Sequence, residues 1–263
     1  MSRLEAAFGA MRERGRGGLV TYVTAGDPNR AASVQILLAL ARAGADVLEV
    51  GVPFSDPLAD GPVIQRATER ALAGGTSLRG ALEVVTRVRE SVDTPIVLFT
   101  YANPVVRMDP TVFAAAARDA GVDGVLILDY PVEEAEPLRA PLIDAGLDPV
   151  FLISPTTTDA RIRRSGELGR GFLYLISRMG VTGVRDDLAS DVSALVGRVR
   201  AQSDLPVAVG FGISSPDHVA RACEAADAAV VGSALVQVIA DHAGDADVAH
   251  RAGEYVRWLK SAL

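Results

Sequence analysis

The segment Asp46–Val50 (DVLEV) and the loop Gly51–Pro62 (GVPFSDPLADGP) that follows it contain the pattern that decides the fold. A short, nearly continuous apolar run leads into a long polar loop, and a helical segment, Val63–Ala73, comes next. Continuous apolar runs are typical of parallel strands that are covered on both faces. The segment therefore predicts a buried parallel strand with a long loop at its carboxyl end.

The same unit of apolar strand, polar loop and helix recurs along the chain. Eight such units in 263 residues match the size of a TIM barrel. The rival fold is a doubly wound open sheet, but no GxGxxG motif follows the first strand. No linker or low-complexity tract divides the chain, so we expect one α/β domain over residues 1–263: a single (β/α)8 TIM barrel with extra helices at the N-terminus, after strand two and after strand eight. The predicted strands are Leu19–Thr24, Asp46–Val50, Pro95–Thr100, Gly124–Asp129, Pro149–Ile153, Phe172–Ile176, Pro206–Val209 and Ala228–Val231, and the predicted helices include Arg30–Ala43, Leu78–Ser91, Pro110–Ala120, Val132–Ala145, Leu188–Gln202 and Pro216–Ala225.

The composition excludes several classes of protein. The net charge is −7 and the basic residues do not cluster, which argues against binding to nucleic acid or to a membrane surface. No apolar stretch approaches the length of about 18 residues that a membrane span needs, and the charged N-terminal segment does not resemble a signal peptide. One cysteine, Cys223, allows no intrachain disulfide and fits a reducing, cytoplasmic location.

Acidic residues follow the predicted strands, where the active site of a barrel lies. Glu49 interrupts an apolar strand that has no solvent-facing side, so we expect a desolvated carboxyl with a raised pKa, suited to general acid–base catalysis. Asp60 precedes Gly61-Pro62 and fits either catalysis or the cap of the next helix. Asp56 stands in a turn context and is better explained by a local hydrogen bond. Asp129 ends strand four, where it could contact the substrate or support the residues that contact the substrate.

Glycine-bearing loops follow strands six, seven and eight, at Ser177–Gly183, Gly210–Ser214 and Gly232–Ala234. Glycine lets backbone N–H groups approach an anion closely. A short extra helix at Ala234–Ala240 would direct its positive N-terminus toward the same place. Because barrels commonly bind phosphate here, the loops predict a phosphorylated substrate.

Other catalytic groups are badly placed for chemistry. The histidines fall in predicted helices rather than at strand ends, Cys223 is also helical, and no set of residues has the spacing of metal ligands. The only lysine, Lys260, lies near the end of the chain, so a Schiff base has no plausible internal amine. Carboxylates remain the main acid–base candidates, and the substrate must supply its own electron sink. The three histidines are His218, His242 and His250.

Five motifs together resemble the tryptophan synthase alpha chain family. They occur in the family's order between about residue 4 and residue 236, and the long strand-two motif is the most specific of them. They are Thr24–Pro28 (TAGDP), Leu48–Pro62 (LEVGVPFSDPLADGP), Thr100–Pro104 (TYANP), Ser177–Gly183 (SRMGVTG) and Gly210–Ser215 (GFGISS).

The resemblance implies the retro-aldol cleavage of indole-3-glycerol phosphate to indole and glyceraldehyde 3-phosphate, with the indole ring as the electron sink. By similarity, Glu49 protonates C3 of the ring and accepts the proton of the glyceryl hydroxyl, while Asp60 stabilises the charge at the ring nitrogen. Thr182 is expected to hold Asp60 through a hydrogen bond. The indole side should be lined by Tyr22, Tyr101, Leu128, Tyr174 and Phe211, and the phosphate should be held by Gly183, Gly212, Gly232 and Ser233.

The resemblance also implies a partner, a beta chain that carries pyridoxal phosphate, in an alpha2beta2 heterotetramer. No cofactor or metal is expected in this chain. Loop two (Pro53–Asp60) and loop six (Arg178–Leu188) are the expected closing elements. The alternatives are a stand-alone lyase that releases free indole, an inactive barrel that only activates a partner, and a different phosphosugar barrel such as an epimerase or isomerase.

Overall fold

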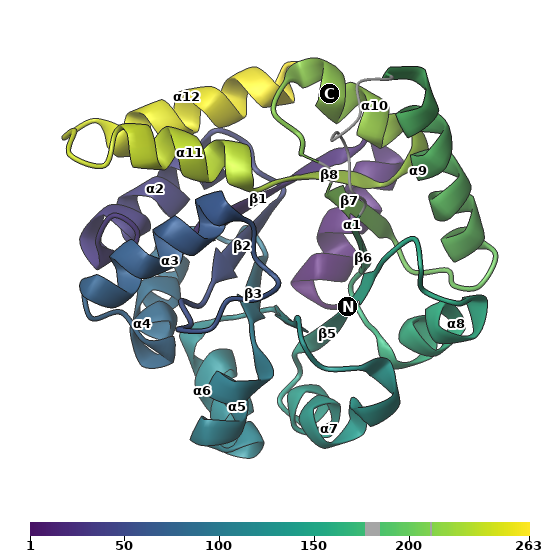
Figure 1. Cartoon of the computed structure of the whole chain (residues 1–263), viewed down its shortest axis with the longest axis horizontal. Helices are drawn as coiled ribbons and strands as arrows, with labels where there is room; N and C mark the ends of the chain where they lie inside the picture. The colour runs from purple at the N-terminus through teal and green to yellow at the C-terminus, as the bar shows by residue number, and fades with distance from the viewer. Residues whose placement is uncertain (177–184, 211) are drawn as a thin grey trace.

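The computed structural model describes residues 1–176, 185–210 and 212–263. Within these residues eight parallel strands close into a barrel in chain order, from β1 to β8, and β8 pairs with β1. Helices surround the ring of strands (Figure 1). The closed barrel confirms the predicted fold and rules out the open sheet. The strands are β1 (Gly18–Thr24), β2 (Val47–Gly51), β3 (Ile96–Thr100), β4 (Gly124–Ile127), β5 (Asp148–Ile153), β6 (Leu173–Ile176), β7 (Val207–Gly210) and β8 (Ala228–Val231).

The extra helices lie where the sequence predicts them: α1 at the N-terminus, α3 after β2 and α11 after β8. The prediction of one helix over Val132–Ala145 is wrong, because a 3-10 turn and α7 divide that segment; Pro137 fits only the first turn of a helix, so α7 starts beside it. Two helices, α5 and α8, were not predicted. The helices are α1 (Arg3–Glu13), α2 (Arg30–Arg42), α3 (Pro62–Ala73), α4 (Leu78–Arg89), α5 (Ala102–Met108), α6 (Pro110–Ala120), η1 (Val132–Glu134), α7 (Glu136–Asp144), α8 (Asp159–Leu168), α9 (Arg185–Arg200), α10 (Pro216–Ala225), α11 (Ser233–Asp241) and α12 (Val248–Lys260).

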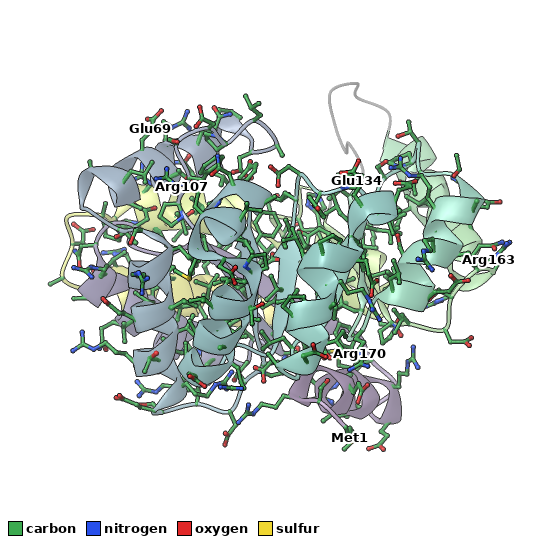
Figure 2. All side chains as sticks on the ribbon, turned by 90° about the horizontal axis from the view of Figure 1, so that it is seen from below. Met1, Glu69, Arg107, Glu134, Arg163 and Arg170 are labelled. Carbon is green, nitrogen blue, oxygen red and sulfur yellow. The ribbon has the colours of Figure 1, made fainter. Side chains whose placement is uncertain are left out.

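Apolar side chains fill the inside of the barrel, and α1 closes its N-terminal end. Alternate residues of a strand share a face, so Val47 points inward with its counterparts on the other strands. The side chains of Leu4, Phe8 and Met11 on α1 are fully buried below them, and the ring centroid of Phe8 lies 5.2 Å from that of Phe172. Figure 2 shows the barrel at right angles to Figure 1, with Met1 at one end and Glu69, Arg107 and Glu134 at the other.

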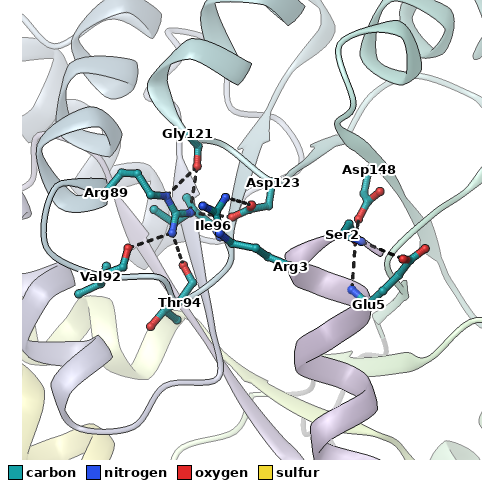
Figure 3. A network of polar contacts seen from close by, with 10 residues as sticks. All are labelled: Ser2, Arg3, Glu5, Arg89, Val92, Thr94, Ile96, Gly121, Asp123 and Asp148. Carbon is teal, nitrogen blue, oxygen red and sulfur yellow. Dashed lines mark hydrogen bonds and ion pairs between the residues drawn. The ribbon is translucent and has the colours of Figure 1, made fainter.

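Polar contacts lock α1 to the strands at the N-terminal end (Figure 3). The carboxylate of Asp123, just before β4, accepts hydrogen bonds from the backbone N–H of Ile96 at 2.8 Å and from Arg89 at 2.6 Å and Arg3 at 3.0 Å. Ser2 caps α1 and donates its hydroxyl to Asp148 at 2.6 Å. This end of the barrel is therefore closed by paired groups.

Two more aspartates repeat the arrangement. Asp46 precedes β2 and accepts the backbone N–H of Leu19 at 2.9 Å, and Asp227 precedes β8 and accepts that of Val207 at 2.9 Å. Each of these carboxylates ties two neighbouring strands together and also has basic partners. The basic partners are Arg14 and Lys260 for Asp46, and Arg12 and Arg200 for Asp227.

None of the described helices is both long and apolar enough to cross a membrane.

Candidate active site

Glu49 lies on the inner face of β2, toward the C-terminal end of the barrel. It lies two residues from both Val47 and Gly51 and so shares their face of the strand, and Val47 belongs to the interior cluster. Its side chain is fully buried, and neither carboxyl oxygen has a hydrogen-bond partner among the described residues. Burial raises the pKa of Glu49 to about 8 because no nearby dipole compensates for the lost hydration. The carboxyl is therefore protonated at neutral pH and ready to donate a proton.

Two tyrosines lie close to Glu49. Tyr22, its partner in the β1–β2 register, and Tyr174 on β6 are both buried. Burial raises the pKa of both hydroxyls, and the charges of Asp60 on Tyr22 and of Glu49 on Tyr174 add to the effect. A side chain at Gly51 would collide with the Tyr22 hydroxyl, so glycine is needed there. Both hydroxyls therefore stay neutral, and that of Tyr22 contacts the Thr24 hydroxyl at 3.4 Å.

Asp60 is held by a side-chain contact that the sequence did not reveal. The hydroxyl of Tyr101 donates to Asp60 Oδ2 at 3.0 Å and accepts the backbone N–H of Ala59 at 3.1 Å. Burial raises the pKa of Asp60, and the Tyr101 hydrogen bond partly offsets this. Gly61 is the N-cap of α3 and no side chain caps that helix in the described structure. The carboxylate of Asp60 is therefore directed to the mouth of the barrel rather than to the start of α3.

The carboxylates of the other acidic candidates each accept a hydrogen bond from a nearby loop or helix. The carboxylate of Asp56 is exposed and accepts the hydroxyl of its neighbour Ser55 at 2.6 Å, as the turn context suggests. Asp129 accepts the backbone N–H of Ala102 at 2.7 Å and so satisfies the start of α5. Its carboxylate supports the segment that carries Tyr101.

An apolar wall completes the mouth beside the two carboxylates. The rings of Tyr22 and Phe99 meet edge to face, with centroids 5.3 Å apart. Leu128, just after β4, and Phe99 are partly exposed beside the interior cluster that also holds Tyr174. Phe99 was not among the predicted site residues, although its position two residues after the inward-facing Val97 predicts the same face. Such a wall suits a flat aromatic ring.

The start of α11 offers free backbone N–H groups near this wall. Gly232 is the N-cap, and no side-chain hydrogen bond caps the helix in the described part of the chain. Ser233 is exposed at the first position, and Gly212, after β7, has a φ of 65° that favours glycine. Uncapped N–H groups at a helix start favour an anion. Of the predicted site residues, Thr182, Gly183 and Phe211 lie outside the described residues.

Among the described residues, no lysine or histidine bonds the carboxylate of Glu49 or Asp60. His218 contacts the loop after β7, where its Nδ1 accepts the backbone N–H of Ser214 at 3.3 Å. Lys260 contacts Asp46 at 2.6 Å, at the N-terminal end of the strands. His218 lies in α10 and His250 in α12, while His242 follows the end of α11. No group of three or more His, Cys, Asp or Glu side chains in the described ranges is arranged to hold a metal ion.

The chain is similar to known proteins in both sequence and structure. Residues 8–263 match the family described as tryptophan synthase alpha chain. The chain is 48% identical over 264 residues to the tryptophan synthase alpha chain of Burkholderia thailandensis, covering 100% of this chain and 97% of that protein. The crystal structure of tryptophan synthase subunit alpha from Legionella pneumophila superposes with a TM-score of 0.92 at 35% identity, covering 100% and 98% of the two chains. A tryptophan synthase structure from Mycobacterium tuberculosis gives a TM-score of 0.90 at 38% identity, with 99% and 98% covered.

Proposed function

The chain belongs to the tryptophan synthase alpha chain family, and we propose that Glu49 and Asp60 carry out its reaction. The enzyme is a lyase of tryptophan biosynthesis that cleaves indole-3-glycerol phosphate to indole and glyceraldehyde 3-phosphate. The observation that carries the assignment is the state of Glu49, which is fully buried, without a partner among the described residues, and has a pKa of about 8. A carboxyl that is protonated at neutral pH is a competent general acid.

In the proposed mechanism, Glu49 donates its proton to C3 of the indole ring, and the ring nitrogen becomes positive. The bond between C3 and the adjacent glyceryl carbon then breaks, and its electron pair restores the aromatic ring. The hydroxyl on that carbon becomes the aldehyde as its proton passes to the Glu49 carboxylate. Asp60 stabilises the positive nitrogen, and the Tyr101 hydrogen bond favours the ionised form that this role requires. The carboxyl of Glu49 is regenerated within the same turnover.

The same geometry supports part of the expected substrate-binding set, and the rest comes from the family resemblance. We propose that Tyr22, Tyr101, Leu128 and Tyr174 line the indole side, together with Phe211. The phosphate is bound by the uncapped start of α11, supported by the backbone conformation at Gly212. This set is Gly212, Gly232 and Ser233, with Gly183 from loop six and Thr182 as the expected partner of Asp60.

An alpha chain implies a beta-chain partner, and we propose an alpha2beta2 heterotetramer in which only the beta chain carries pyridoxal phosphate. We place the partner on the face formed by loop two and α5, because apolar side chains are exposed there: Leu58 is 92% exposed and Val106 on α5 is 56% exposed. Between these elements lies a cavity of about 630 Å³ lined by Phe54, Asp56, Asn103 and Arg107, among others. We further propose that residues 1–263 form one domain, that the chain needs no cofactor of its own, and that it acts in the cytoplasm.

An indole-release assay tests the assignment. The purified chain should release indole from indole-3-glycerol phosphate, and Asp60→Asn should lower turnover at least about tenfold because the ring nitrogen loses its counter-charge. A beta chain should co-elute with the chain in gel filtration and raise its turnover at least about tenfold by favouring the closed loops. Full activity of Asp60→Asn would overturn the assignment. A chain that is fast alone and binds no beta chain would support the stand-alone lyase.

A further inference from the structure

Helix α3 begins directly after the Asp60 loop, and its first turn holds the backbone of that loop. The side-chain amide of Gln65 donates hydrogen bonds to the carbonyl of Asp60 at 2.9 Å and to that of Pro57 at 3.4 Å. Tyr101 binds the Asp60 carboxylate from the other side. The position of this carboxylate therefore depends on where α3 places Gln65.

The far end of α3 is fixed to the loop after β1. Arg70 donates two parallel hydrogen bonds to the buried carboxylate of Asp27, from Nε at 2.7 Å and from Nη2 at 2.8 Å. A two-bond guanidinium–carboxylate contact fixes direction as well as distance. Thr76, just beyond α3, packs so closely over Gly26 that a side chain there would collide with it, and the φ of 89° at Gly26 also favours glycine. The helix is thus anchored at a point distant from the Asp60 loop.

The middle of α3 packs against the phosphate side of the mouth. Ala67 forms a small apolar cluster with Tyr22 of β1 and Val236 of α11. Figure 1 shows α3 beside α11, and the two helices are in contact. A helix of 12 residues held at its end and along its face moves as one body.

From these contacts we propose that Asp27, Arg70 and Gln65 are positioning residues for Asp60. The Asp27–Arg70 ion pair fixes the axial position of α3, and Gln65 transfers that position to the backbone of the Asp60 loop. None of the three is required to touch the substrate. The inference rests on the proposed role of Asp60 in the reaction.

The test uses substitutions that keep size or charge while removing the directional contact. Arg70→Lys keeps the positive charge near Asp27 but cannot make two parallel bonds, and Gln65→Met keeps the length of the side chain without a donor. Each should lower kcat for indole release about tenfold and leave KM within about twofold, since small displacements of a catalytic group weaken transition-state contacts more than binding. Both variants should act on one element, so the double variant should be no slower than the slower single variant.

Arg89→Lys is the matched control. Arg89 also bonds a buried aspartate, Asp123, but at the opposite end of the barrel. It should lose stability in urea unfolding and keep the kcat of the wild-type chain. If Arg89→Lys lowers kcat as much as Arg70→Lys does, the effect is general destabilisation and the proposal fails.

Asp60→Asn, measured beside these variants, separates the two proposals. If Asp60→Asn is slow while Arg70→Lys and Gln65→Met match the wild-type chain, the positioning proposal fails and the role of Asp60 stands. If Asp60→Asn is fully active, the proposed function itself fails. Multiplying losses in the double variant would also overturn the inference, because they would show that the two contacts act independently.

Discussion

Carboxyl groups at the two ends of the barrel differ in how many polar partners they have. At the N-terminal end, Asp46, Asp123 and Asp227 each accept a strand N–H group and at least one basic side chain, and they tie the strands together. At the C-terminal end, Glu49 is buried without a partner in the described structure, and the carboxylate of Asp60 accepts a single hydrogen bond from the side chains of the described residues, that of Tyr101. A carboxylate that is fully paired stabilises the fold, whereas one left unpaired becomes a reactive acid.

The largest effect should come from removing a paired carboxylate. Asp123→Ala leaves Arg89, 13% exposed, without its ion-pair partner and Ile96 without its side-chain acceptor. It should lower the free energy of unfolding by about 3–5 kcal/mol. Asp119→Ala removes an ion pair between Asp119, 68% exposed, and Arg118, 55% exposed. It should change the free energy of unfolding by less than about 1 kcal/mol. Urea unfolding measures both; equal costs would remove the distinction between the two kinds of pair.

A matched change of carboxylate to amide sharpens the contrast in activity. Glu49→Gln should lower turnover at least about a hundredfold, because it removes the general acid. Binding of a substrate analogue should change little. Asp123→Asn should keep turnover within about twofold, since the N-terminal face lies outside the site. Steady-state indole release measures both variants, and similar losses in the two would show that the ends do not differ in function.

The pH dependence tests the unpaired state of Glu49 directly. Its pKa is raised from 4.5 to about 8, so turnover should fall as pH rises through about 8, roughly tenfold per unit once the proton is lost. The folded state then binds more protons than the unfolded state between these two values, so this group lowers stability progressively from pH 4.5 to 8. Glu49→Gln should become more stable than the wild-type chain over that interval and not below it. A turnover that stays flat to pH 10 would contradict the assignment.

The smallest expected effect is a change in KM, and it comes from the different N-termini of α1 and α11. Ser2 caps α1 with its side chain, whereas α11 starts at Gly232 without a side-chain cap in the described structure. Gly232→Asp places a fixed negative charge where the phosphate is proposed to bind, and KM for indole-3-glycerol phosphate should rise about tenfold. Gly232→Asn, of equal size, is the control and should raise KM much less. Equal KM values for the two variants would move the phosphate away from α11.

The sequence predicts the barrel and Glu49 for the same reason. A charged residue in a continuous apolar run cannot face solvent once the strands are parallel and covered on both sides. The burial of Glu49 can therefore be predicted from the few residues around it. The role of Asp60 was ambiguous because either partner, the start of α3 or a residue from another strand, fitted the sequence. Tyr101 and Asp60 are separated by 41 residues, and only the β2–β3 register brings them together.

Other contacts stayed hidden for the same reason. Gln65 looks like an ordinary polar residue of an amphipathic helix until the loop before it folds back over the first turn. Helix α5 was not predicted because the acceptor for the backbone N–H of its first residue, Ala102, is Asp129, which lies 27 residues later in the loop after β4. The hydrophobic pattern predicts the helices and strands and which of their faces are buried. Contacts between loops are set only when the barrel closes, so the sequence does not predict them.

The paired end also constrains how the molecule is made. Helix α1 precedes every strand of the barrel in the chain, yet its Arg12 bonds Asp227, which lies 215 residues later, just before β8. Lys260 near the C-terminus bonds Asp46 in a similar way. The contacts at the base of the barrel can be completed only after Asp227 and Lys260 have left the ribosome. A nascent chain that lacks β8 and α12 therefore has an unsealed base and buried groups without their partners, which makes closure of the ring a late and slow step of folding.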